Sequence, residues 1–232
     1  MTPLMIPPRA RGIEILDNPA VSPEVMTRSM KDVVRANILF GGRRAALAEL
    51  LPAVRELPGS GDILDIGTGL GDIPIAARES ARSMGIALRT IGIDTSPPLV
   101  ALQQGSMDAV VRGDALALPF ADNSVDIAMA SQVLHHFETD QAIEFVREMN
   151  RVARKRVVIS DLRRSRIAAA GLWLGSFPLG FHPISRHDGV VSVMRGFLPA
   201  ELAEIVEAAT GQRPEVHRRL GFRLTTSWNP KP

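Results

Sequence analysis

The residues that could bind a ligand begin with three glycines at alternate positions, Gly67, Gly69 and Gly71. They follow a short apolar run, residues 63–66, and precede a segment compatible with a helix. Glycine lets a ligand approach the backbone closely, and a helix N-terminus offers free N–H groups to it. A strand, a glycine turn and a helix start therefore predict a site for a nucleotide-like cofactor.

Two acids stand where the next two apolar segments end. Asp94 closes residues 89–94, and Asp114 follows the third segment. An acid at the end of the second strand can accept hydrogen bonds from both hydroxyls of a ribose that lies across the first loop. We expect Asp94 to bind ribose, with capping of the turn at residues 96–98 as the alternative. We expect Asp114 to accept from an adenine amino group, with capping of its own loop as the alternative.

Two adjacent histidines, His135 and His136, follow the fourth apolar segment, residues 125–130. Histidine changes charge near neutral pH, so either ring could take a proton from a phenol or another hydroxyl. The alternative is packing or hydrogen bonding beside the cofactor without a catalytic role. Successive residues point in different directions, so we expect at most one ring to face the substrate, and we prefer His136.

The order of these motifs resembles the class I S-adenosylmethionine-dependent methyltransferases, strongly over about residues 60–162. The late segments 186–189 and 197–202 are more loosely similar to small-molecule members of that family. The matching motifs lie at residues 64–71, 92–94, 113–115 with 118–120, and 134–137. A dinucleotide dehydrogenase is the competing interpretation of the loop, but its glycines are spaced Gly-x-Gly-x-x-Gly, and here the spacing is Gly-x-Gly-x-Gly.

The resemblance implies that S-adenosyl-L-methionine is the cofactor and that its methionine, ribose and adenine lie across three successive strands. It also implies that Asp65, which precedes the loop, helps to hold the methionine amino group. The residues expected to bind the cofactor are Asp65, Gly67, Thr68, Gly69, Gly71, Asp94, Thr95, Asp114, Ala115 and Ser131.

Composition narrows the class of protein. The 232 residues suit one α/β domain with a sizeable core. The absence of cysteine excludes disulfides, thiolate metal ligands and cysteine catalysis. No metal-ligand spacing is present among the other residue types, so no metal is expected. The net charge of +2 predicts no strong field, and a clustered basic face is lacking, so no nucleic-acid partner is expected.

Nothing in the chain predicts export or membrane insertion. Residues 1–11 contain prolines and arginines but are not followed by the apolar core of a signal peptide. The longest apolar run, residues 167–181, is interrupted by glycine and Pro178 and is too short to span a bilayer. We therefore expect a cytoplasmic protein without a transmembrane segment, and the oligomeric state is left open.

The elements that must position these residues alternate between strand and helix. This alternation predicts an α/β fold with a mostly parallel sheet. The tight joint at Gly221 predicts an antiparallel last strand, and the resemblance implies a Rossmann-like, seven-stranded sheet with helices on both faces. Strands are expected near residues 62–67, 89–94, 108–113, 125–130, 155–161, 213–220 and 222–229. Helices are expected near residues 24–39, 43–56, 140–151 and 199–208.

A single methyltransferase domain with four segments is expected. They are an N-terminal helical cover (1–58), a cofactor-binding core (59–162), a substrate-lid insertion (163–200), and a last helix with the final strands (201–232). In the insertion, Trp173 and Phe177 belong either to the core or to an apolar lid. The pair His187 and Asp188 could orient a base, but a hydrogen-bonded turn before Gly189 is preferred.

The sequence predicts methyl transfer to a small, largely apolar acceptor, through O-methylation of a phenolic or quinol hydroxyl. C-methylation of a quinone or aromatic ring is the close rival. A non-catalytic cofactor-binding module and a nucleic-acid methyltransferase are alternatives of other classes. Against the latter, residues 131–134 read Ser-Gln-Val-Leu, where enzymes that methylate base amino groups carry Asn or Asp, two prolines and an aromatic residue.

Overall fold

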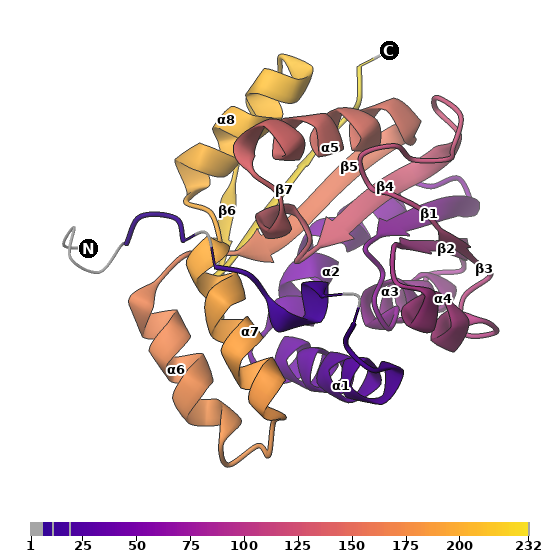
Figure 1. Cartoon of the computed structure of the whole chain (residues 1–232). Helices are drawn as coiled ribbons and strands as arrows, with labels where there is room; N and C mark the ends of the chain where they lie inside the picture. Colours follow the sequence, from indigo (N-terminus) through magenta and orange to yellow (C-terminus); the bar gives the residue numbers. More distant parts are fainter. Residues whose placement is uncertain (1–6, 11, 19, 232) are drawn as a thin grey trace.

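A seven-stranded sheet forms the centre of the computed structural model, which describes residues 7–10, 12–18 and 20–231 (Figure 1). The strands are β1 (Ser60–Ile66), β2 (Ala87–Asp94), β3 (Ala109–Arg112), β4 (Val125–Ser131), β5 (Ala153–Leu162), β6 (His217–Arg219) and β7 (Arg223–Trp228). Their order in the sheet is β3-β2-β1-β4-β5-β7-β6. The first five strands are parallel, whereas β7 runs antiparallel to both β5 and β6. The predicted Rossmann-like fold is confirmed.

Helices cover both faces of this sheet. The helices are α1 (Pro23–Leu39), α2 (Gly42–Arg55), α3 (Asp72–Ser83), α4 (Pro97–Gln103), α5 (Thr139–Val152), α6 (Arg166–Ser176), α7 (Pro183–Arg195) and α8 (Pro199–Thr210). Two short 3-10 turns, η2 (Ile15–Asp17) and η3 (Leu134–His136), lie near the strand ends. Helices α5 and α8 pack together on one face, and α2 and α3 on the other (Figure 1).

The core explains why β1 and the other central strands are almost wholly apolar. Leu64 and Ile66 face the cluster under α5, whereas Ile63 faces the cluster under α2 and α3. Alternation of this kind, with apolar residues on both faces, is what a parallel strand covered by helices on both sides requires. On α5, Val146 and Met149 are fully buried, as the three-residue apolar spacing predicts. The strand ends are therefore held in fixed positions.

Two predictions about the chain after β5 are wrong. The expected strand at 213–220 is reduced to His217–Arg219, because Pro214 lacks the N–H that a strand pairing needs. The expected turn before Gly189 is helical, since residues 183–195 form α7. The antiparallel α6 and α7 lie side by side below the sheet in Figure 1.

Two aromatic residues of the insertion, Trp173 and Phe177, do not belong to the core. Trp173 is 48% exposed and Phe177 is 49% exposed, and their rings contact each other edge to face at 4.9 Å. Other residues of this region, Leu172 and Phe181, line the cleft described below. Within residues 7–10, 12–18 and 20–231, no helix is both long and apolar enough to cross a bilayer. Residues 1–6 and 11 of the N-terminal stretch lie outside the described residues, and the division into four segments stays a prediction.

Candidate functional site

The glycine loop needs glycine for both conformation and space. Gly67, Gly69 and Gly71 have φ values of 69°, 53° and 67°, in the left-handed region that other residues rarely adopt. A Cβ atom on Gly67 would lie 2.5 Å from Val133 Cγ2, and one on Gly69 would lie 2.8 Å from Met30 Cε. No side chain fits at either position without movement of its neighbours, so the loop forms a close-fitting cradle for a ligand.

Asp94 ties this cradle to the end of β2. Its Oδ2 accepts a hydrogen bond from the Gly69 N–H (3.0 Å), and its Oδ1 accepts one from the Ser96 N–H (2.9 Å). The turn contact expected as an alternative to ribose binding is thus present. Each carboxylate oxygen keeps a further lone pair for a ribose hydroxyl, so the two roles are compatible. Burial raises the pKa of Asp94, and the backbone hydrogen bonds oppose this rise.

Asp65 lies beneath the cradle and does not line the cleft. It is 4% exposed, and its Oδ2 accepts a hydrogen bond from the Thr68 hydroxyl (2.8 Å). Burial, reinforced by the negative charges of Asp72 and Asp94, raises the pKa of Asp65 to about 8. No cation among the described residues neutralises this carboxyl group through an ion pair. A ligand ammonium group near it would favour the ionised form.

A cleft of ≈ 1810 Å³ runs along the C-terminal edge of the parallel strands. Among the residues predicted from sequence, its wall contains Gly67, Gly69, Asp94, Thr95, Asp114, Ala115, His135 and His136. The other predicted residues, Asp65, Thr68, Gly71 and Ser131, are not in its wall. The Ser131 hydroxyl is buried without a hydrogen-bond partner. Asp114 is exposed and accepts the Leu116 N–H at 2.9 Å, which is the loop-capping contact expected as its alternative.

His135 is buried between two carboxylates. Its Nδ1 lies 2.7 Å from Asp161 Oδ1, and its Nε2 lies 3.6 Å from Glu14 Oε1. Burial by itself lowers the pKa of His135, but the attraction of Asp161 and Glu14 outweighs it and raises that pKa to about 9. The ring is 2% exposed, so a protonated His135 serves best to fix the surrounding backbone and charges.

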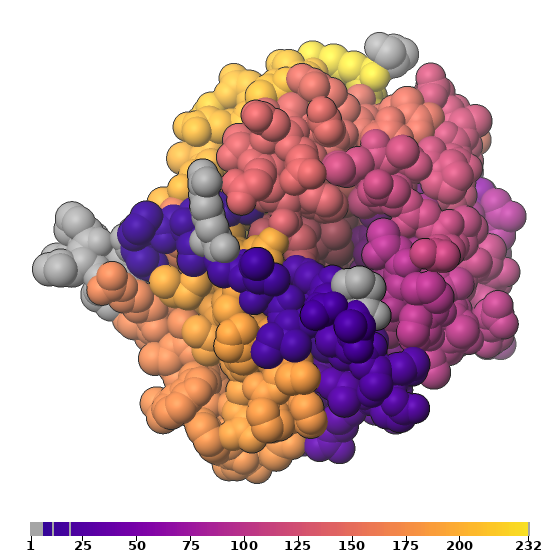
Figure 2. All heavy atoms as spheres, viewed as in Figure 1, coloured from indigo at the N-terminus to yellow at the C-terminus, as the bar shows by residue number. Residues whose placement is uncertain are grey.

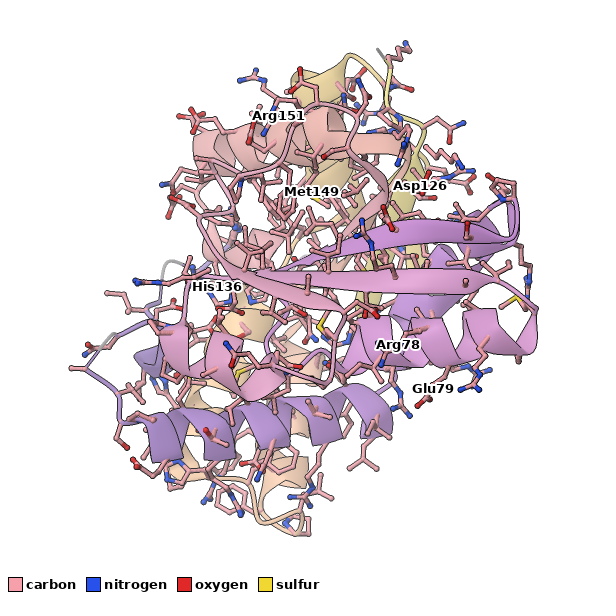
Figure 3. The ribbon with its side chains drawn as sticks, turned by 90° about the vertical axis from the view of Figure 1, so that its right-hand side faces the viewer. Arg78, Glu79, Asp126, His136, Met149 and Arg151 are labelled. Atoms are coloured by element: carbon pink, nitrogen blue, oxygen red, sulfur yellow. The ribbon has the colours of Figure 1, made fainter. Side chains whose placement is uncertain are left out.

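His136 lies nearer to the open cleft, with 30% of its side chain exposed. Its Nδ1 is 3.2 Å from Asp17 Oδ1, and its Nε2 is 3.9 Å from Glu14 Oε2. Figure 3 shows His136 at the strand ends above α1, whereas Asp126 lies at the opposite end of the sheet. Of the two histidines, His136 is the one that a ligand in the cleft can reach.

Three carboxylates around the histidines were missed in the sequence. Glu14 and Asp17 belong to the N-terminal segment (residues 7–10 and 12–18), far from the histidines along the chain, and no motif marks them. Asp161 is the next-to-last residue of β5 and could have been found as another acid near a strand end. Atoms of Glu14, His135 and His136 lie within 4.8 Å of one another, so they could hold a metal ion. The expectation of no metal therefore stays a prediction.

The N-terminal segment lies across the cleft between α6–α7 and the loops that follow the strands; Figure 2 shows it in indigo. The carboxylate of Asp188 accepts the N–H groups of Ile15 and Leu16, both at 2.9 Å. Arg9 donates to the carbonyl oxygens of His135 (3.1 Å) and Phe137 (2.8 Å). Asp188 thus anchors the backbone of the N-terminal segment. His187, whose Nδ1 lies 2.8 Å from Asp188 Oδ1, is not in the cleft wall.

The structure is an α/β protein with a cleft at the C-terminal ends of its parallel strands. A family model described as a methyltransferase domain matches residues 64–160. The chain is 36% identical over 187 residues to the demethylmenaquinone methyltransferase of Roseiflexus sp. (strain RS-1), covering 73% of this chain and 75% of that protein. The chain belongs to the class I S-adenosylmethionine-dependent methyltransferases, and S-adenosylmethionine is its cofactor.

Other comparisons agree with this family. The demethylmenaquinone methyltransferase of Roseiflexus castenholzii is 37% identical over 130 residues, and the match covers 54% of this chain and 50% of that protein. The solved structure of human N-acetylserotonin methyltransferase with its cofactor matches with a TM-score of 0.63 at 12% identity, covering 90% of this chain and 56% of that one. The solved structure of a methyltransferase from Aquifex aeolicus matches with a TM-score of 0.60 at 16% identity, and the match covers 91% of this chain and 100% of that one. At such identities the structures show the fold alone.

Proposed function

We propose that this enzyme methylates the hydroxyl oxygen of a small, largely apolar phenol or quinol. The observation that carries the proposal is the position of His136, which is partly exposed in the wall of the cleft that also contains Asp94. A base beside the bound cofactor suits an acceptor that must lose a proton as it reacts.

The chain offers a matching place for each part of the cofactor. The glycine cradle would receive the methionine part, with Asp65 beneath it, while Asp94 would accept from the ribose and Asp114 from the adenine. When bound, the cofactor supplies an activated methyl group on a sulfonium. The remaining work of the protein is to align the acceptor, exclude water and remove a proton.

The walls beyond the cofactor place indicate an apolar acceptor. Side chains from α1 and from the insertion face this part of the cleft, and most of them are apolar. They include Met26, Met30, Val33, Ile167, Leu172 and Phe181. A mostly apolar wall with a few polar groups is typical of small-molecule sites.

His136 would take the proton of the acceptor hydroxyl. Asp17 and Glu14 lie beside its ring and would stabilise the imidazolium that forms. His135 does not contact the acceptor in this proposal. Held by Asp161, it fixes the loop on which His136 lies and is a positioning residue.

C-methylation of a quinone-type ring is the second candidate. It is favoured by the two relatives named demethylmenaquinone methyltransferases, whose name indicates a quinone-type acceptor. The same base could take a proton from a quinol hydroxyl while the ring carbon accepts the methyl group; that carbon then loses its hydrogen as a proton and the oxygen is reprotonated, which restores the aromatic ring. The two candidates therefore differ in the product and not in the residues required.

A panel of phenols, quinols and quinones, incubated with S-adenosylmethionine, tests both candidates. Mass spectrometry should detect a product heavier by one methyl group, and NMR of that product distinguishes an O-methyl from a C-methyl group. A C-methyl product would replace the first proposal by the second. Formation of no methylated product from any phenol, quinol or quinone, in a protein that binds the cofactor, would contradict both.

A further inference from the structure

A buried arginine at the wall of the cleft has no acidic partner. Arg223, the first residue of β7, is 5% exposed and lines the cleft. Its Nη1 donates to Gln132 Oε1 at 2.8 Å, and its Nε is buried without a hydrogen-bond partner. Across residues 7–10, 12–18 and 20–231, no carboxylate forms an ion pair with it.

A comparison with the other deeply buried arginine shows that this is unusual. Arg164 is 4% exposed, and its guanidinium pairs with Glu201 at 2.7 Å. Burying a charged group without a counter-ion is costly, so such groups are normally paired. Asp161 attracts Arg223 from beyond pairing distance, but its oxygens already bond to the His135 ring and to backbone N–H groups.

The uncapped start of α2 lies against the same guanidinium. The Cβ position of Gly42, the first residue of α2, is 3.2 Å from Arg223 Nη2. Gly41 precedes it with φ of 80°, and no side chain caps the helix. The free N–H groups and the dipole at a helix N-terminus favour an anion. Two independent positive features therefore converge on one part of the cleft, which Gly41 and Arg223 both line.

The guanidinium is held in place by two amide side chains. Gln132 donates to Asn37 Oδ1 and accepts from Arg223, so its amide group is fixed in one orientation. Gln132 has φ of 58°, a conformation that costs energy outside glycine and persists when the surroundings enforce it. Gln132 follows β4 and precedes η3, so the guanidinium is connected directly to the loop that carries the histidines.

We propose that Arg223 and the N-terminal turn of α2 form a carboxylate-binding subsite in the cleft, with Gln132 and Asn37 orienting the guanidinium. The carboxylate has two possible sources, the methionine part of the cofactor and an acid group on the acceptor. The planar guanidinium suits a carboxylate because two N–H groups can donate to its two oxygens. The subsite does not depend on which atom is methylated.

Calorimetric binding to three probes separates the two sources. S-adenosylhomocysteine carries the methionine-derived carboxylate, and 5′-methylthioadenosine lacks it. Benzoate, added to protein saturated with S-adenosylhomocysteine, represents an acidic acceptor, and benzamide is its neutral counterpart. The variants are Arg223→Met and Arg223→Lys, with Arg154→Met at an exposed position of β5 as the matched control.

If the cofactor is the source, Arg223→Met should weaken S-adenosylhomocysteine binding about 10- to 100-fold and leave 5′-methylthioadenosine binding unchanged. If the acceptor is the source, benzoate binding should fall by a similar factor, while S-adenosylhomocysteine and benzamide binding stay unchanged. Arg223→Lys should lose less than Arg223→Met in either case, because it keeps the charge. The control should change neither.

Two results would overturn the subsite. In the first, Arg223→Met leaves S-adenosylhomocysteine binding unchanged, and benzoate either does not bind the wild type or binds both proteins equally. In the second, the substitution weakens 5′-methylthioadenosine as much as S-adenosylhomocysteine, which would indicate general damage to the site. Arg223→Met removes a buried charge but also the hydrogen bond to Gln132, and these two effects on stability oppose each other, so a folded variant is expected. Because binding is measured, failure here is distinguishable from failure to find an acceptor.

Discussion

The two halves of the cleft differ in how the chain builds them. The half proposed to bind the cofactor, called the cofactor half, consists of the loops after β1, β2 and β3, and its acids Asp65, Asp94 and Asp114 lie at or close to the strand ends. The half proposed to bind the acceptor, called the acceptor half, combines the N-terminal segment, α1, η3, the helices α6 and α7, and the start of β7. Its charged groups meet from far apart in sequence; Asp17 and His136, for example, are 119 positions apart.

The two halves differ in how far along the chain the residues lie that hold each functional group in place. A glycine loop and an acid at a strand end act through their own backbone, so they need little from the rest of the chain. The ring of His136 instead depends on Glu14 and Asp17, which in turn depend on how α7 holds their segment. We therefore expect substitutions in the glycine loop to change binding, and substitutions around His136 to change turnover with cofactor binding preserved.

The largest effect is expected from His136→Gln. Loss of a general base lowers turnover by about 10²- to 10⁴-fold, while S-adenosylhomocysteine binding stays as in the wild type. Steady-state kinetics with the acceptor that the panel identifies measure turnover, and calorimetry measures S-adenosylhomocysteine binding. His187→Gln, at the half-exposed histidine of α7, is the control and should leave both unchanged. Full turnover by His136→Gln would show that His136 is not the general base.

Gly67→Ala should disrupt the cofactor half instead. The new Cβ would clash with Val133 and would hold a left-handed conformation, which together cost about 1–3 kcal/mol. Calorimetry should show S-adenosylhomocysteine binding weakened by about 10- to 100-fold. Gly85→Ala is a matched control, because Gly85 has φ of 75° but open space around it. Equal losses of affinity in both variants would show that the loss does not come from the glycine loop in particular.

A smaller, pH-dependent effect is expected at Asp65. Its pKa, raised to about 8 by burial, means that much of the ligand-free protein carries a protonated Asp65 at neutral pH. The methionine ammonium group favours the carboxylate, so binding should release a proton and tighten as pH rises from 6 to 8. The gain is at most about tenfold per pH unit.

Calorimetry of S-adenosylhomocysteine in buffers of different ionisation enthalpy measures the released proton. Asp65→Asn should bind more weakly and with no proton release over this range. Asp114→Asn, which changes an exposed acid of the same cleft, should keep the proton release. Proton release that persists in Asp65→Asn would assign it to another group.

The smallest effect on function is expected from Asp188→Ala. The change removes the carboxylate that accepts from the Ile15 and Leu16 N–H groups. The free energy of local opening of the N-terminal segment should fall by about 1–3 kcal/mol as a result. Hydrogen exchange at these two amides should become faster, and S-adenosylhomocysteine binding should not change. Asp140→Ala, at an exposed position of α5, is the control. Unchanged exchange at Ile15 and Leu16 would show that another contact holds the segment.

The cofactor half could be predicted because its signals are short. The glycine spacing, with Asp94 and Asp114 at the next strand ends, depends on a few consecutive residues and on the order of strands. The alternating strands and helices likewise predicted the sheet and its antiparallel last strand. Even there, the proton-binding property of Asp65 was hidden, because it follows from burial and from neighbouring charges.

Apart from its two histidines, the acceptor half could not be predicted, for particular physical reasons. Gly189 indicated a turn, but it lies inside α7, where a Cβ would be 2.8 Å from Leu172 Cδ2; the glycine allows α6 and α7 to pack closely. Glu14 has no neighbouring motif that would connect it with His135. Arg223 stands in an ordinary strand, and only the packed structure shows that its charge is buried without an acid beside it.

The bond between Asp188 and the backbone of Ile15 and Leu16 has a consequence for protein synthesis. The N-terminal segment leaves the ribosome early, but the helix that holds it is made more than 160 residues later, as the separation of 173 positions between Ile15 and Asp188 implies. The sheet can assemble around β1 to β5 before that moment. The nascent chain therefore acquires a place for the cofactor first, and completes the surroundings of His136 only when α7 has been translated and folded.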